Sequence, residues 1–319
     1  MKSLPFLNPA AGSPAVRNPG RPAIIVPTQA LDAEDLAAEC AAAAAAGIVD
    51  AVEWRIDPLL AAASGSAQGG AQGGAHSGMH GLAEAALRLL PHALTAELPI
   101  LLTVRTGFEG GQVEITEDAY AEVVRELIAG VADVEADAGT AAGTGPSGTG
   151  LSGTGPSGTG PSGTASSGVP GSASSGVPAA IDVEIDRAEA GSLIASAREA
   201  GVPVVASHHN FESTDSSERL LKTFAVMSEA GADVAKVAMM PQTPADVLRL
   251  LEATAAADAS LPVPVLGIAM GLLGRTSRIM GADFGSCATF AQIGRASAPG
   301  QIEASVLAEI LDRVGCWCA

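Results

Sequence analysis

Short apolar segments rich in β-branched residues alternate with longer segments rich in Ala, Leu and Glu along most of this chain. The short segments, which we expect to be strands, are Ala23–Val26, Ala51–Ile56, Ile100–Arg105, Ala180–Ile185, Val202–Ser207, Asp233–Met239, Val263–Ala269 and Gly285–Phe290. Helical segments follow most of them, at Asp32–Ala46, Leu82–Leu94, Glu117–Glu135, Arg187–Ala200, Ser216–Ala230, Pro244–Ala257 and Gln301–Val314. Several strands are apolar without alternation, which is typical of parallel strands covered on both faces. This pattern predicts an α/β protein with a (β/α)8 TIM barrel.

A doubly wound open sheet is the competing architecture for the same alternation. Such a sheet normally carries a glycine-rich phosphate-binding loop directly after its first strand. Here the first strand runs into Val26-Pro27-Thr28-Gln29, which contains no glycine. The barrel is therefore favoured, and its functional groups are expected at the carboxyl ends of the strands.

Two glycine-rich stretches interrupt the alternation and hold half of the 38 glycines. Residues 139–178 repeat pentapeptides such as GTGPS without a charged side chain, so they can bury too little to offset the entropy of ordering. Residues 61–80 have a similar composition, and a helix that would pair His76 with His80 is not expected there. We predict a single catalytic domain over residues 22–319, with disordered inserts at 61–80 and 139–178 and an extension at 1–21.

The balance of charge excludes several classes of partner. A formal net charge of −18 disfavours nucleic acid. No apolar run reaches the ~20 residues that span a bilayer, and residues 1–21 lack the apolar core of a signal peptide. The cysteines, at 40, 287, 316 and 318, show no metal-binding spacing beyond one weak Cys-x-Cys pair. We therefore expect reduced thiols in a cytoplasmic protein without a bound metal.

Polar residues recur where the predicted strands end. Glu53, Arg55 and Asp57 alternate along the second strand, so their side chains point the same way. The others are Arg105 and Glu109 at and after the third strand, His208 and His209 after the fifth, Lys236 within the sixth, Arg278 after the seventh, and Ser297 and Gln301 after the eighth. Because the carboxyl ends of the strands meet at one rim of a barrel, we expect these residues to form one site.

Lys236 interrupts an apolar strand, whereas Lys2 and Lys222, the other two lysines, occupy positions typical of the surface. A lysine in such a strand can snorkel from the strand end or pair with a buried acid. It can also act as an amine nucleophile toward a carbonyl, since desolvation and nearby arginines would favour its neutral form. The arginines expected at neighbouring strand ends favour the nucleophile.

Two adjacent histidines end the fifth strand, and only one of them can point into the barrel. An inward histidine beside Lys236 would move protons on the carbon next to an imine. Glu109 is a candidate to orient that ring. The alternative is that His208 and His209 are capping or surface residues and that Glu109 is an exposed loop carboxylate.

Arginine suits two-pronged recognition of a carboxylate, although barrels also use it in structural pairs. Arg55 is close in sequence to Glu53 and Asp57 and is a candidate for such a pair. Arg278 has no acid until Asp283, so it is the candidate clamp for a substrate carboxylate. The segment 297–301 is either an ordinary turn or a polar loop that closes over an anionic, hydroxylated ligand.

Eight separated motifs carry a family resemblance. They are Glu53-Trp54-Arg55-Ile56-Asp57, the segment from Arg105 to Gly111, Ile181-Asp182-Val183-Glu184, His209-Asn210-Phe211, the segment from Lys236 to Gln242, Ser277-Arg278, the segment from Phe284 to Phe290, and the segment from Ala296 to Gln301. In this order, over about residues 22–314, the chain resembles the type I 3-dehydroquinate dehydratases, (β/α)8 enzymes of the shikimate pathway.

The resemblance implies a role for each matched residue. Lys236 would form a Schiff base with the substrate ketone, and His209, rather than His208, would be the catalytic histidine with Glu109 beside it. The substrate contacts implied are Arg278 for the carboxylate, Glu53, Arg55 and Arg105 around the ring hydroxyls, Ser297 and Gln301 in the closing loop, and Met270 and Phe290 as apolar packing. Two positions depart from the family pattern: Asn210 replaces the usual Asp, and Thr28 matches a first-strand contact only weakly.

The reaction implied is dehydration of 3-dehydroquinate to 3-dehydroshikimate in a homodimer, without a metal or organic cofactor. The partner expected is a small anionic substrate, with no nucleic acid and no membrane. Two alternatives are a Schiff-base aldolase on the same fold and a non-catalytic ligand-binding barrel. The aldolase would often carry phosphate-binding glycines after strands seven and eight, whereas Arg278 and the 297–301 loop indicate a carboxylate.

Overall fold

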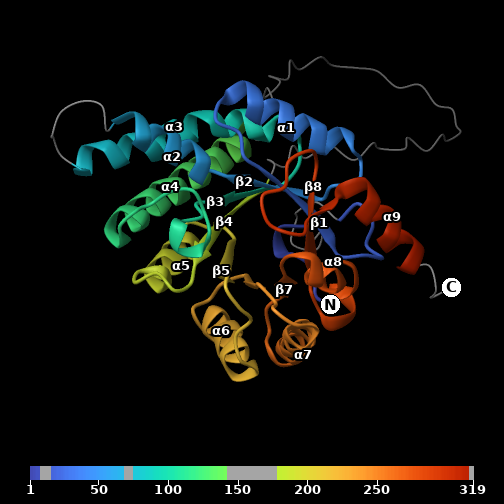
Figure 1. Ribbon diagram of the computed structural model, residues 1–319. Helices are drawn as coiled ribbons and strands as arrows, with labels where there is room; N and C mark the ends of the chain where they lie inside the picture. The colour runs from blue at the N-terminus through green and yellow to red at the C-terminus, as the bar shows by residue number, and fades with distance from the viewer. Residues whose placement is uncertain (8–15, 68–74, 142–177, 316–319) are drawn as a thin grey trace, which may run out of the picture.

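The computed structural model is a barrel of parallel strands surrounded by helices (Figure 1). It describes residues 1–7, 16–67, 75–141 and 178–315, without the side chains of 64–67, 75–80, 82 and 134–141. The strands are β1 Ala23–Thr28, β2 Ala51–Arg55, β3 Ile100–Thr103, β4 Ala179–Glu184, β5 Val204–Asn210, β6 Val234–Met239, β7 Val265–Ala269 and β8 Ala288–Gln292. Strands β1 to β7 that are neighbours in sequence are neighbours in the sheet. β8 pairs with β1, and the short strand β9 Ile302–Glu303 pairs in parallel with β8. A parallel bridge between Val265 and Ser286 links β7 to the β8 side and closes the barrel.

The helices lie outside the strands, as Figure 1 shows. They are α1 Ala33–Ala45, α2 Asp57–Ala67, α3 Ala75–Leu94, α4 Glu117–Ala141, α5 Ala190–Glu199, α6 Ser217–Glu229, α7 Pro244–Ser260, α8 Arg275–Met280 and α9 Ala304–Gly315. Side-chain caps explain why several begin where they do. Asp32 caps α1 and Ser216 caps α6, while Thr243 and Asp246 form a capping box ahead of α7, with Pro244 in its first turn.

The glycine-rich region 61–80 is more helical than its composition predicts. Helix α2 continues to Ala67 and α3 begins at Ala75, so the expectation of no helix around His76 and His80 was wrong. In α2, Pro58 suits the first turn of a helix and the alanines that follow have the highest helix propensity. His76 and His80 belong to the first turns of α3, whose later residues are rich in Ala and Leu and propagate the helix. Residues 68–74 of this insert, and 142–177 of the second, lie outside the described residues.

The barrel has two hydrophobic cores. The outer core fills the space between strands and helices, and its largest side chains include Trp54, Tyr120 and Phe224. The inner core gathers small and branched residues that the strands point inward, such as Leu101 and Val205. Alternation along each strand separates the two sets, because successive side chains face opposite sides of the sheet.

The first residues of the chain are part of the inner core. Leu4, Phe6 and Leu7 are buried in the same cluster as inward-facing strand residues, so this part of the 1–21 extension packs into the barrel. Asp258 of α7 anchors the segment: Lys2 Nζ lies 2.8 Å from its Oδ1, and the terminal amine lies 3.4 Å from its Oδ2. We refer to residues 1–7 as the N-terminal plug.

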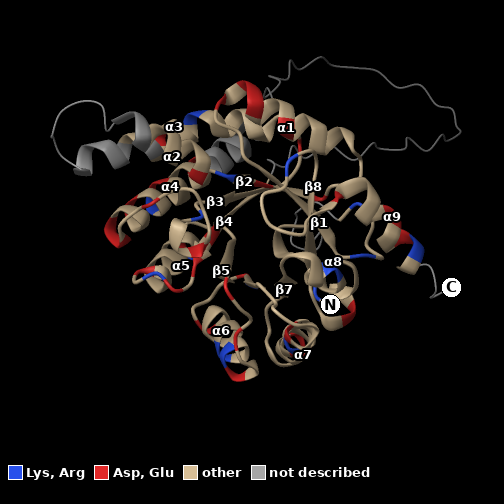
Figure 2. Cartoon of the chain, in the orientation of Figure 1, with Lys and Arg blue, Asp and Glu red and all other residues tan. Residues whose placement is uncertain are grey.

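Charged residues are distributed unevenly between surface and interior. Figure 2 shows Asp and Glu on the surrounding helices, which is where much of the net negative charge lies. None of the helices, within the part of the chain that is described, is long and apolar enough to cross a membrane.

The plug generates a stability prediction. Replacing Phe6 with Ala removes a large buried side chain and should lower the free energy of unfolding by about 3–5 kcal/mol. Urea unfolding followed by circular dichroism measures this difference. As a control, Leu248→Ala on the exposed face of α7 should change it by less than about 0.5 kcal/mol. Equal stability of the two variants would show that the plug does not hold the barrel together.

Candidate active site

A layer of polar side chains replaces the apolar inner core toward the carboxyl ends of the strands. Its members, all buried, are Glu53 of β2, Thr103 of β3, Asp182 of β4, Ser207 of β5 and Lys236 of β6. The layer is internally bonded: the Thr103 hydroxyl donates to Glu53 Oε1 at 3.2 Å, and the Ser207 hydroxyl donates to Asp182 Oδ1 at 2.6 Å. The polar atoms of this layer thus find partners despite their burial, as stability requires.

Lys236 lies between two carboxylates. Its Nζ is 3.4 Å from Glu53 Oε1 and 3.5 Å from Asp182 Oδ2, and it lies 4.6 Å from the centroid of the Phe290 ring. Only 3% of the residue is exposed. The three arginines expected near this amine, Arg55, Arg105 and Arg278, line the same cavity, but the ion-pair partners of Nζ are Glu53 and Asp182.

Arg105 is the centre of a buried ionic cluster. Its guanidinium donates to Asp182 and Glu109, each at 2.7 Å, to Glu184 at 3.1 Å and to the Ser207 hydroxyl at 3.0 Å. Burial alone would lower the pKa of Arg105, but the surrounding carboxylates raise it well above its ordinary value. For Asp182, burial is outweighed by Arg105 and Lys236, which lower its pKa. Arg105 therefore helps to hold Asp182 in the charged form inside the barrel.

Glu109 is presented by a short turn after β3. A 3-10 turn, Gly107–Glu109, is fixed at Thr106, whose backbone N–H and hydroxyl both donate to the Glu184 carboxylate. Gly110 then adopts a φ of 77°, which favours glycine, and a Cβ on Gly111 would collide with the Arg105 carbonyl. These two glycines let the chain turn back beneath the glutamate.

The two histidines at the end of β5 point in different directions. His209 lines the central cavity, and its Nδ1 lies 2.7 Å from Glu109 Oε2. Burial, followed by the charges of Arg105 and Lys236, lowers the pKa of His209 well below its ordinary value. His208 is absent from the lining of that cavity, and its Nδ1 lies 2.5 Å from Asp186. His209 is therefore a neutral imidazole held by a carboxylate inside the site.

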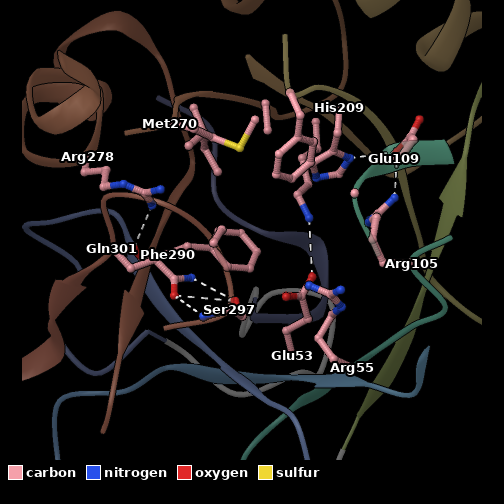
Figure 3. A pocket seen from close by; sticks show the side chains of 16 residues that line it. Glu53, Arg55, Arg105, Glu109, His209, Met270, Arg278, Phe290, Ser297 and Gln301 are labelled. Atoms are coloured by element: carbon pink, nitrogen blue, oxygen red, sulfur yellow. Dashed lines mark hydrogen bonds and ion pairs between the residues drawn. The ribbon is translucent and has the colours of Figure 1, made fainter. Parts of the chain in front are cut away.

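One cavity of about 490 Å³, including its open mouth, brings together all nine site residues predicted from the sequence (Figure 3). They are Glu53, Arg55, Arg105, Glu109, His209, Lys236, Arg278, Ser297 and Gln301. Met270 and Phe290, also expected, contribute apolar lining together with Ile268. Figure 3 shows His209 and Glu109 on one side of the cavity and Arg278 with Gln301 on the other, and Lys236 also lines the cavity.

The arginines at this cavity differ in how their charge is compensated. Arg55 forms a two-pronged pair with Asp57, at 2.6 and 2.8 Å. Arg278 instead donates to the carbonyls of Phe290 and Pro299, both at 3.1 Å, and its buried Nε has no partner among the described residues. Burial lowers the pKa of Arg278 to about 10. A buried guanidinium without a carboxylate partner is suited to bind an anion.

The segment 297–301 lies against the end of β7. The Ser297 amide donates to Gln301 Oε1 at 2.8 Å, and Gln301 Nε2 donates to the Ser297 hydroxyl at 3.1 Å. Gly300 has a φ of 78°, and a Cβ there would collide with the Gly271 carbonyl. Close approach of these two glycines brings the polar ends of Ser297 and Gln301 to the cavity.

Three buried partners of the site were missed as site residues by the sequence reasoning: Asp182, Glu184 and Ser207. The signal was present on β4, where Asp182 and Glu184 stand two apart in an apolar strand, as Glu53 and Arg55 do on β2. Thr28 faces away from the barrel interior and lines a separate cavity with Glu39 of α1.

Asn210, which departs from the family pattern, terminates β5 and supports the following turn. Its Oδ1 accepts the amides of Glu212 and Ser213, both at 3.0 Å. An amide oxygen serves here as a carboxylate oxygen would.

Glu109, Asp186 and His208 are the described residues whose ligand atoms lie close enough together to hold a metal ion. Nδ1 of His208 and Oδ2 of Asp186 are only 2.5 Å apart, however, which is a direct hydrogen bond. Two ligands of one zinc ion, each about 2.1 Å from it, stand farther apart than this. The geometry favours an ion pair over a metal centre.

The fold and the pocket define a (β/α)8 barrel enzyme built around a buried lysine and a carboxylate-held histidine. Residues 24–144 and 172–315 match the family model of type I 3-dehydroquinase. The 3-dehydroquinate dehydratase of Klebsiella pneumoniae subsp. pneumoniae is 32% identical over 273 residues, which cover 83% of this chain and 84% of that relative. The chain belongs to the type I 3-dehydroquinase family.

Solved structures agree. The 3-dehydroquinate dehydratase of Geobacillus kaustophilus superposes with a TM-score of 0.69 at 25% identity, covering 93% of each chain. The type I 3-dehydroquinate dehydratase of Clostridium difficile with covalent modified comenic acid gives a TM-score of 0.67 at 25% identity, covering 95% of each chain.

The contrast between two buried arginines gives a prediction. Arg105→Met leaves several buried carboxylates without their cation and should lower the free energy of unfolding by about 3–5 kcal/mol. Arg278→Met should change it by less than about 1 kcal/mol, because losing two backbone hydrogen bonds is offset by relief of an uncompensated buried charge. Chemical denaturation of both variants tests this, and equal losses would contradict it.

Proposed function

We propose that this protein catalyses dehydration of 3-dehydroquinate to 3-dehydroshikimate through an imine on Lys236. The observation that carries the proposal is the placement of one buried amine between Glu53 and Asp182, at a cavity that also holds the His209–Glu109 pair and the unpaired Arg278. An amine, a neutral imidazole and an anion clamp are the groups that this dehydration needs.

The first step joins Lys236 to the substrate ketone. The neutral amine attacks the carbonyl carbon, the oxygen leaves as water, and a protonated imine remains. Glu53 lies close enough to the amine to take up its proton before attack. In the imine, the positive charge draws electrons from the neighbouring carbon and acidifies its C–H bond.

His209 then transfers protons. When Glu109 is ionised, Nδ1–H of His209 donates to its Oε2, and the lone pair on Nε2 is then free to act as a general base. It removes the acidified proton to give an enamine. The same group returns a proton to the leaving hydroxyl, which departs as water, and hydrolysis of the imine releases the product and restores the amine.

The remaining residues hold the substrate. Arg278 binds its carboxylate, because this is the cavity arginine without an acidic partner among the described residues. Glu53, Arg55, Ser297 and Gln301 border the space for the ring hydroxyls. Arg105 also borders it, but its hydrogen bonds to acids suit it mainly to arranging Glu109 and Asp182.

A Schiff-base aldolase and a non-catalytic barrel are less well supported. The covalent modified comenic acid of the Clostridium difficile relative is consistent with covalent chemistry in the family. The family and Arg278, which has no acidic partner among the described residues, favour a carboxylate substrate over a sugar phosphate. We also propose, from the family resemblance, a cytoplasmic homodimer that acts in the shikimate pathway. The unpaired thiols of Cys40 and Cys287 are in keeping with a reducing compartment.

Imine formation can be trapped. Protein incubated with 3-dehydroquinate and reduced with borohydride should gain a stable adduct at Lys236, which mass spectrometry of the protein and its peptides locates. Without reductant, the enone product should appear by ultraviolet absorbance. Lys236→Met should show neither signal, whereas Lys222→Met on exposed α6 should behave as wild type. Folded wild-type protein that gives neither adduct nor enone is incompatible with the proposal.

Proton transfer can be separated from imine formation. His209→Ala removes the base and should reduce turnover by about 10²–10⁴-fold, while borohydride still traps the adduct at Lys236. At pH 9 or above, His208→Ala should reduce turnover much less than His209→Ala does. Equal losses from the two variants at high pH would contradict the assignment of His209 as the base.

A further inference from the structure

The two oxygens of Glu109 have different surroundings. Oε2 lies 2.7 Å from both Arg105 Nη1 and His209 Nδ1. Oε1 is buried and has no hydrogen-bond partner among the described residues, but Nδ1 of His208 lies 3.9 Å away. Adjacent histidines of β5 therefore approach different oxygens of one carboxylate.

His208 is held as a cation by its neighbours. Its Nδ1 lies 2.5 Å from Asp186 Oδ2 and its Nε2 lies 3.3 Å from Asp215 Oδ2. Carboxylates only accept hydrogen bonds, and a neutral imidazole has a single N–H, so bonds at both nitrogens require the doubly protonated ring. Burial alone would lower the pKa of His208, but Asp186, Glu109 and Asp215 raise it above its ordinary value.

The charges around this pair come from four elements. Glu109 faces Arg105 at the end of β3, two acids of β4, and the two histidines of β5. The acids are Asp182 and Glu184. Burial raises the pKa of Glu109 to about 8, while Arg105 and His208 act to lower it. Beyond His208, Asp215 also pairs with Arg219 of α6 at 3.1 Å. His208 is thus the cation that faces the otherwise unpartnered oxygen of Glu109.

The charge of Glu109 decides which nitrogen of His209 carries the proton. An ionised Glu109 accepts the Nδ1–H and leaves the lone pair on Nε2, facing the cavity. A protonated Glu109 would donate to Nδ1 instead, and the ring proton would then sit on Nε2. In that state the imidazole has no lone pair with which to accept a proton from substrate.

We propose that His208 is a positioning residue for the dehydration: its positive charge favours the ionised form of Glu109 and so favours the tautomer of His209 that has its free lone pair on Nε2. Asp186 and Asp215 maintain that charge by holding both nitrogens of the His208 ring. This inference rests on the proposed function, because it assigns His208 a part in the proton transfer by His209.

The test is the pH dependence of kcat in His208→Asn and His208→Gln. Losing the nearby positive charge raises the pKa of Glu109. The acid limb of the kcat–pH profile should therefore move up by about one pH unit, which lowers kcat about tenfold at a given pH on that limb. Near pH 9.5, where Glu109 ionises without help, both variants should come within about twofold of wild type. His208→Lys restores a positive charge at this position and should reduce the shift of the acid limb to about half. The control His92→Asn, at an exposed position, should leave the pH profile unchanged.

Borohydride adducts and thermal melting accompany each profile. An unchanged acid limb in a folded neutral variant, or an equal loss at every pH, overturns the role of His208 while wild-type turnover and adduct formation still support the proposed function. Wild-type protein without turnover or adduct overturns both. Because the rescue occurs at high pH, a merely structural defect, which would lower kcat throughout, is told apart from a change in the charge of Glu109.

Discussion

The burial of charge inside a closed barrel is the constraint on which this structure depends. Each buried ion loses hydration that is worth several kcal/mol, and it is tolerated only when partners replace the water. Arg105 meets this demand for three carboxylates at once, one beyond β3 and two on β4, and it also holds the Ser207 hydroxyl of β5. The ionic cluster therefore joins three strands at the end where chemistry takes place, and the apolar layer beneath it excludes competing water.

Among the described residues, one buried cation at the cavity lacks a carboxylate partner. Lys236, Arg55 and Arg105 all have carboxylates within hydrogen-bond reach, whereas the guanidinium of Arg278 is bonded to carbonyl dipoles. Dipoles arranged in advance do not neutralise a charge, so Arg278 leaves an uncompensated positive charge at the cavity. An anionic ligand would complete the balance, with its carboxylate at Arg278.

Much of this arrangement could be predicted from the sequence, because strand order places the site. Parallel strands end at one rim, so polar residues spaced through the chain were expected to converge, and the cavity contains all of them except Asp57 and His208. The partners inside the barrel were harder to predict, since the bond between Arg105 and Asp182 depends on how neighbouring strands pair and how their side chains reach. Helix α2 was missed because the glycines that follow hid its alanine-rich beginning within one averaged composition.

The N-terminal plug restricts how small molecules enter and leave the cavity. Its apolar side chains fill the barrel on the side away from the polar layer, so the described cavity communicates with solvent at the rim of carboxyl ends. Substrate, product and the water that dehydration releases must then use one passage. A molecule in the cavity blocks entry of the next one, so product must leave before a new substrate molecule binds. The rate at which product leaves through this passage therefore sets an upper limit on turnover, however fast the proton transfers are.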